Sequence, residues 1–137
     1  MPRDVRGVTS FLESDGEVLI LQRSQQVSTY KGAWGGVSGG IKDKNTPEGQ
    51  ARQEIAEETG LSAQDIQLIK QGQPLVFEDT TLQVKKTVYP FLFHIKDRHK
   101  IKIDWEHTGI KWIKPAEIKN YATMQKLEEA LASVMYP

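Results

Sequence analysis

Residues 39–61 read GGIKDKNTPEGQARQEIAEETGL, a glycine-rich turn that leads into a segment with strong helix signals. Thr46 and Pro47 are typical of a helix start, because threonine caps free backbone N–H groups and proline favours the first helical position. Gly60 is a typical helix stop, since glycine adopts the left-handed conformation there at little cost. The stretch therefore predicts a helix over Pro47–Thr59.

The predicted helix carries three carboxylates, those of Glu54, Glu57 and Glu58. Residues three and four positions apart are neighbours on a helix, so the three carboxylates share one face. Like charges at this spacing repel one another, which leaves two interpretations: the face is solvated, or a cation lies among the glutamates. Carboxylate oxygens suit hard cations such as Mg²⁺ or Mn²⁺.

Composition restricts the remaining possibilities. The 137 residues carry 38% apolar and 26% charged residues with a formal net charge of zero, which predicts one domain over residues 1–137. A neutral chain lacks the basic excess of proteins that bind extended nucleic acid or membrane surfaces. Cysteine is absent, which excludes disulfides and thiolate sites and is compatible with a reducing cytoplasm. We find no signal peptide and no apolar run long enough to span a membrane.

Strand patterns surround the helix. Asp15-Gly16 is a strong hairpin signal between two apolar segments, and Pro90 interrupts a long apolar run, which favours a bulge or a strand end there. We predict strands at 5–12, 18–23, 74–77, 82–95, 101–103 and 110–113, and within 61–71 a short turn followed by a strand. We also predict a loop at 24–31, a helical turn at 115–118 and a final helix at 123–135. This order predicts an α/β fold in a single domain.

The stretch 39–61 resembles the Nudix box, whose pattern is G-x5-E-x7-R-E-U-x-E-E-x-G-U, where U is a bulky aliphatic residue. The run from Glu54 to Leu61 matches every specified position, and Gly39 lies at the required distance upstream. The segments 19–23, 104–107 and 111–118 also resemble strands and loops of the family, so the resemblance covers roughly four-fifths of the chain.

The resemblance implies an α/β/α sandwich with a mixed β-sheet, as in MutT-like hydrolases. It also implies hydrolysis of the pyrophosphate link in a nucleoside diphosphate derivative, with Mg²⁺ or Mn²⁺ as the cofactor. In the family, the positions of Glu54, Glu57 and Glu58 and the carbonyl of Gly39 hold the metal. The partner implied is a small nucleotide derivative, and homodimers are common among relatives.

Two positions depart from the box pattern. Gln53 stands where the family has arginine, and Asn45 stands where it has the first glutamate. Arg52 points to the opposite side of the helix from Glu54 and cannot replace the missing arginine. Gln53 can hydrogen-bond Glu57 one turn away but cannot neutralise it, and Asp43 is the alternative acidic residue of the loop. Loss of the groups that steady metal ligands costs about 10–100-fold in affinity or activity.

Three residues outside the box are candidates for the site. Glu106 is a candidate metal ligand or general base, an alternative to the catalytic glutamates Glu54 and Glu57, although it could be an ordinary surface carboxylate. Arg23 could contact a phosphate or form a surface salt bridge. Trp34 could stack on a nucleobase or pack in the core.

The altered positions keep a second function open, that of a non-catalytic Nudix-fold module that binds a nucleotide or a protein. An isoprenoid isomerase on the same fold is disfavoured, because that activity would call for a cysteine acid/base and the chain has none.

Overall fold

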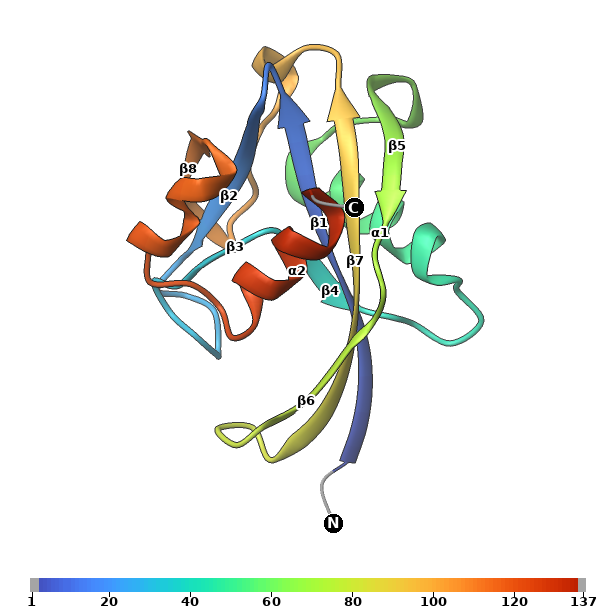
Figure 1. Cartoon of the computed structure of the whole chain (residues 1–137), viewed down its shortest axis with the longest axis vertical. Coiled ribbons are helices and arrows are strands. Elements are labelled where there is room, and N and C mark those ends of the chain that lie inside the picture. The colour runs from blue at the N-terminus through green and yellow to red at the C-terminus, as the bar shows by residue number, and fades with distance from the viewer. Residues whose placement is uncertain (1–2, 136–137) are drawn as a thin grey trace.

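The computed structural model describes residues 3–135, and its centre is a pair of long parallel strands (Figure 1). β1 (Arg3–Ser14) and β7 (Val84–Ile95) pair from Arg3↔Val84 to Glu13↔His94. Parallel strands lie in the interior of a sheet because both faces are covered. The inner halves of the two strands are accordingly apolar, with Phe11, Phe91 and Phe93 all fully buried.

The strands beside β1 form one end of the sheet. β2 (Glu17–Arg23) pairs with the end of β1 across a tight turn in which Asp15 and Gly16 have φ values of 53° and 79°, as expected for an Asp-Gly hairpin. β8 (His107–Ile113) and β3 (Trp34–Gly35) pair with β2, whereas β4 (Val37–Gly40) pairs with β1.

The strands beside β7 form the other end. β5 (Ile66–Gln71) and β6 (Leu75–Asp79) both pair with β7 in antiparallel fashion. Pro90 lies between the part of β7 that pairs with β6 and the part that pairs with β5, so its missing N–H falls at a break in the ladder. The irregular register lies in β5, between Leu68 and Lys70.

The described residues form one eight-stranded mixed sheet with a helix on each face (Figure 1). α1 (Pro47–Thr59) buries Ala51 and Ile55 in one hydrophobic core, and α2 (Leu127–Met135) buries Leu127 and Leu131 in the other. This arrangement confirms the predicted α/β/α fold with a mixed sheet. No helix of residues 3–135 is both long and apolar enough to cross a membrane.

Two predicted elements were wrong in detail. Residues 101–103 form no strand. The short turn and following strand predicted within 61–71 are confirmed, as the 3₁₀ turn Ala63–Asp65 and the strand β5. The final helix begins at Leu127 and not at residue 123, because Lys126 has a left-handed φ of 67° that a helix cannot contain. Two further 3₁₀ turns, Arg98–Lys100 and Pro115–Asn120, follow β7 and β8.

Candidate active site

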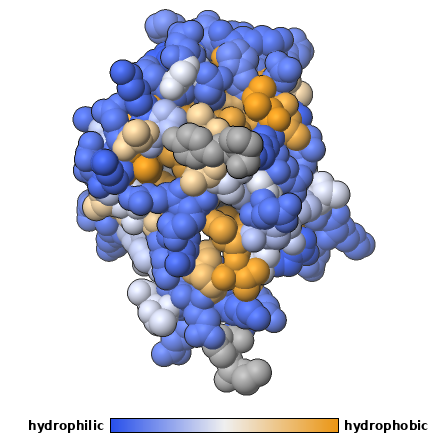
Figure 2. Space-filling model, in the orientation of Figure 1, coloured by the Kyte–Doolittle hydropathy of each residue, from blue (hydrophilic) through white to orange (hydrophobic). Residues whose placement is uncertain are grey.

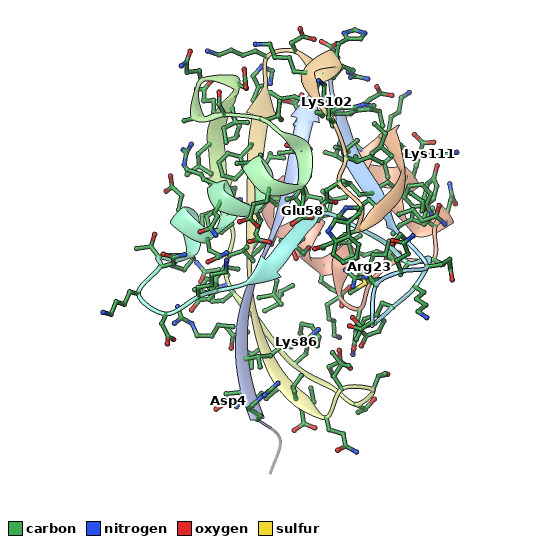
Figure 3. The ribbon with its side chains drawn as sticks, turned by 180° about the vertical axis from the view of Figure 1, so that it is seen from behind. Asp4, Arg23, Glu58, Lys86, Lys102 and Lys111 are labelled. Atoms are coloured by element: carbon green, nitrogen blue, oxygen red, sulfur yellow. The ribbon has the colours of Figure 1, made fainter. Side chains whose placement is uncertain are left out.

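The position of the glutamates is set by the two ends of α1. The side chain of Thr46 accepts a hydrogen bond from the backbone N–H of Gly49 at 3.0 Å, and Gly60 ends the helix with a φ of 76°. The helix bounds therefore agree with the sequence prediction. Glu54 lies against β4 and Glu58 faces the loop that precedes β8, whereas Glu57 is exposed on the helix. Figure 3 shows Glu58 in the middle of the molecule, beneath α1.

Glu54 lies directly against the backbone of β4. A Cβ atom at Gly39 would come within 2.3 Å of the Glu54 carboxyl carbon and oxygen, so only glycine leaves room for this carboxylate. Burial raises the pKa of Glu54 above its ordinary value, although a hydrogen bond from Gln50 partly offsets this effect. The glycine at the start of the box is thus required by close contact with the first metal-ligand candidate.

A network of amides holds the glutamates where the family pattern has arginine and glutamate. The fully buried Gln50 donates from Nε2 to Glu54 Oε2 at 2.8 Å, and its Oε1 accepts from Asn45 Nδ2 at 2.7 Å. Asn45 also donates to Gln53 Oε1 at 3.3 Å, and Gln53 donates to Glu57 Oε1 at 3.1 Å. The predicted Gln53–Glu57 hydrogen bond is confirmed.

Gln50 was missed by the sequence analysis. Its spacing of four residues before Glu54 was the available signal, because residues at that spacing are neighbours on a helix. Arg52 takes no part in the network: its Nε lies 2.9 Å from Glu48 Oε2 and its guanidinium lies 5.3 Å from the Phe93 ring centroid. Asp43 is exposed in the loop before α1.

Glu58 is the most perturbed group of the site. Burial, together with the negative charges of Glu54, Glu106 and Asp104, raises the pKa of its carboxyl to about 10. One of its oxygens, Oε2, is buried without a hydrogen-bond partner. The other, Oε1, lies 3.7 Å from Nε2 of the buried His107. A buried carboxylate in this state is costly unless a cation or proton balances it.

The loop before β8 brings Glu106 to the same place. Its backbone carbonyl accepts from the N–H of Ser24 at 2.7 Å, which ties the loop to the end of β2. Asp104 Oδ1 accepts from the backbone N–H of Glu106 at 3.2 Å and lies 3.0 Å from His107 Nδ1. The side chains that follow β7 and those of α1 thus converge, as expected for Glu106 from its place in the sequence.

The donor set fits a divalent cation. The described residues hold no group of three or more His, Asp or Glu side chains already arranged as a metal cage. However, the unpartnered buried oxygen of Glu58, the mutual repulsion of four carboxylates and the close fit of Gly39 to Glu54 are all features that a cation among the carboxylates would account for.

A cavity of about 430 Å³ is lined by these carboxylates together with residues of the sheet and of α2. Glu54, Glu106 and Gly39 line it near Val8, with which Gly39 pairs. Lys86 and Phe77 line it near Val5, farther toward the start of β1, because Lys86 pairs with both Val5 and Phe77. Arg23 also lines the cavity, but its Nε and Nη2 donate to the backbone oxygen and hydroxyl of Thr29 at 3.0 and 3.2 Å.

Trp34 is not among the residues that line the cavity. Its ring packs edge-on against Tyr121 at a centroid distance of 5.6 Å, and its backbone N–H donates to Ala122 at 2.9 Å. This environment corresponds to the packing alternative considered for Trp34. A role of Trp34 in stacking on a nucleobase stays a prediction without a contact that supports it.

Comparisons with solved structures place the fold among hydrolases. An E. coli dihydroneopterin triphosphate pyrophosphohydrolase superposes with a TM-score of 0.78 at 19% identity, covering 93% of this chain and 92% of the other. A MutT protein from Methanosarcina mazei Go1 gives 0.76 at 20% identity, covering 95% and 91%. A C. elegans Ap4A hydrolase gives 0.73 at 18% identity, covering 96% and 93%.

Similarity at this level of identity concerns the fold alone, but the sequence itself carries the family pattern. The model of the NUDIX domain matches residues 1–134, nearly the whole chain. The class of enzyme that this match supports is a pyrophosphohydrolase. The chain belongs to the NUDIX domain family.

Proposed function

We propose that this protein hydrolyses the pyrophosphate linkage of a small nucleoside diphosphate derivative with Mg²⁺ or Mn²⁺. The observation that carries the proposal is the buried, unpartnered Oε2 of Glu58 among the carboxylates of Glu54, Glu106 and Asp104. A solvated helix face, the alternative interpretation, would not bury such a group.

Each residue has a distinct task in this proposal. Glu54, Glu57, Glu58 and the carbonyl of Gly39 would hold the cation. Once bound, the cation would offset the charge of the pyrophosphate and lower the pKa of a water molecule. Glu106 lines the cavity beside Glu54, so its carboxylate can take the proton of the attacking water while the bridging P–O bond breaks.

The amide network supports catalysis in place of the family's charged pair. Gln50 and Gln53 each hold one glutamate oxygen through an N–H donor, at 2.8 and 3.1 Å respectively. Amides fix the orientation of a carboxylate without neutralising it, so the full negative charge remains for the cation. We therefore propose a working site that is held by hydrogen bonds where relatives use charge.

A metal-dependent substrate screen tests the proposal. The purified protein is incubated with Mg²⁺, Mn²⁺ or EDTA and with nucleoside triphosphates, sugar nucleotides, ADP-ribose, dinucleoside tetraphosphates and dihydroneopterin triphosphate. The last two are included because structural neighbours are named for them. Release of a mononucleotide or of pyrophosphate from at least one compound, with metal and not with EDTA, is expected. No release from any compound would contradict the proposal.

The second candidate is a nucleotide-binding module without turnover, and the altered positions Gln53 and Asn45 favour it. Gln53→Arg separates the two functions, because it restores the charge of the family pattern next to Glu57. A large gain in turnover would indicate a weakened catalytic site. Binding detected by calorimetry with no turnover in either form would indicate the module. Action in the cytoplasm and assembly into a homodimer stay predictions.

A further inference from the structure

The far end of the cavity is built differently from its acidic end. The β-strands contribute Val5, Phe77, Leu75 and Val88, which share one face of the sheet because Lys86 pairs with both Val5 and Phe77, and Val88 pairs with Leu75. Leu127 of α2 lines the cavity from the opposite side. Hydrophobic side chains gather on this face below α2 (Figure 2). Such walls suit a flat, uncharged ring.

Lys86 lines the cavity together with three other cations, Arg6, Arg23 and Lys126, and its own position is fixed. Its Nζ lies 3.2 Å from Oδ2 of Asp79, whose side chain is only 1% exposed. Asp79 is held in turn by the hydroxyl of Tyr30 and by the backbone N–H of Leu82, which donates at 3.1 Å. Tyr30 also places its ring 5.7 Å from Lys86 Nζ. In Figure 3, Lys86 extends from β7 toward the side of the molecule where Arg23 lies.

The charge balance of this pair limits what it can bind. Lys86 and Asp79 together are neutral, so the pair offers little net attraction for a second phosphate. An ammonium has three N–H donors, and the contact with Asp79 uses one of them. Because Lys86 also lines the cavity, the remaining donors are available to a neutral hydrogen-bond acceptor inside it.

We propose that Lys86 makes this cavity selective for a nucleobase that presents a carbonyl edge, a 6-oxopurine in preference to a 6-aminopurine. Guanine offers two acceptors, O6 and N7, on the edge where adenine offers N7 and the N6 amino donor. The N6 amino group of adenine is a donor, so it cannot accept a hydrogen bond from the Lys86 ammonium. This inference rests on the proposed function only in taking the substrate to be a nucleotide.

Binding of monophosphates tests the preference without turnover, since they have no pyrophosphate link to hydrolyse. Calorimetry with GMP, IMP and AMP is carried out in the presence of Mg²⁺. GMP and IMP should bind about tenfold or more tightly than AMP, the ratio expected for one hydrogen bond to a charged donor. IMP lacks the 2-amino group of GMP, so equal binding of these two assigns the preference to the 6-oxo edge.

Two variants assign the preference to Lys86. Lys86→Met should weaken GMP and IMP about tenfold and leave AMP within about twofold. Lys86→Gln offers an amide oxygen as well as an N–H, so the dissociation constants of the three nucleotides should lie within about threefold of one another. This variant replaces Lys86→Met in the test if the Met variant does not fold. Lys85→Met is the matched control, because Lys85 is exposed and points to the other face of β7.

Equal binding of the three nucleotides by the wild type would overturn the proposal. So would an equal loss for all three in Lys86→Met, or the same change in Lys85→Met. If the GMP preference is found but no substrate is hydrolysed, the assignment of Lys86 stands and the hydrolytic function fails. If turnover is found without any base preference, the hydrolytic function stands and the assignment of Lys86 fails.

Discussion

Gly39 is the residue at which the absence of a side chain matters most to the site. A Cβ at this position would lie 2.3 Å from the Glu54 carboxylate, whereas a Cβ at the neighbouring Gly40 would meet only the Arg6 carbonyl oxygen at 3.9 Å. The two glycines are therefore a matched pair. One is required by the site, and the other has room for a methyl group.

Gly39→Ala should reduce turnover about 10–100-fold, because the added methyl group displaces Glu54 from the position that Gln50 holds. Gly40→Ala should change turnover less than about threefold, since its contact is an ordinary one. Steady-state kinetics and circular dichroism of both variants check this. Equal activities for the two variants would argue against Glu54 as a working ligand.

Gln50 is the second single residue that should strongly affect the protein, in this case its stability. Its buried amide serves Lys42, Asn45 and Glu54 at once, so Gln50→Leu leaves several polar groups without partners. The free energy of unfolding should fall by about 1–3 kcal/mol in urea denaturation. The exposed Gln64→Leu should change it by less than about 0.5 kcal/mol. A Gln50→Leu protein as stable as the wild type would contradict the importance of the network.

At the scale of elements, α1 depends on its caps. Thr46→Ala removes the hydroxyl that accepts from Gly49 and should lower stability by about 1 kcal/mol, whereas Thr46→Ser keeps the acceptor and should be nearly neutral. Thermal unfolding of the two variants measures the difference. If serine and alanine destabilised equally, the hydrogen bond would not be the source of the effect.

The elements also show what sequence alone can predict. α1 was predicted to the residue because its start and stop signals, Thr46, Pro47 and Gly60, are local. The start of α2 was wrong because the left-handed conformation of Lys126 leaves no mark in the apolar periodicity. Glu54, Glu57 and Glu58 were found by their spacing, whereas the role of Gln50 required the loop before α1 to fold back onto the helix.

Most contacts between distant segments could not be predicted from the sequence. Tyr30 and Asp79 are 49 residues apart, and Glu58 and His107 are also far apart in the chain, so only the folded sheet brings them together. The prediction that Glu106 reaches the site depended on its place in a loop that follows the central strands. The structure agrees with it by placing Glu106 and Glu54 in one cavity.

At the scale of the whole molecule, Asp79 joins the loop after β2 to the β6–β7 hairpin. Burial alone would raise the pKa of Asp79, but hydrogen bonds from Tyr30 and Leu82 and the charge of Lys86 hold the pKa below its ordinary value. A carboxylate with a lowered pKa stabilises the fold above its unfolded-state pKa, and this contribution is lost as the pH falls through the folded-state pKa.

Asp79→Asn should therefore cost about 1.5–3 kcal/mol of stability at pH 7, the range for hydrogen bonds to a charged group. The difference from the wild type should persist down to about pH 5 and shrink as the pH falls below about 4. Urea denaturation at a series of pH values follows the difference. A deficit that stays constant down to about pH 2 would show that the charge of Asp79 is not responsible.

The central claim is that the carboxylates of α1 hold the cation that hydrolysis requires. Glu57→Gln and Glu48→Gln are isosteric changes on the same helix. Glu48 is the control, because it lies at the helix start and its carboxylate forms a salt bridge with Arg52 at 2.9 Å. Mg²⁺-dependent turnover of the best substrate, together with Mg²⁺ binding by calorimetry, compares the two variants. Glu57→Gln should lose about 100-fold in turnover and bind Mg²⁺ more weakly, while Glu48→Gln should keep both. Unchanged turnover and Mg²⁺ affinity in Glu57→Gln would contradict the account.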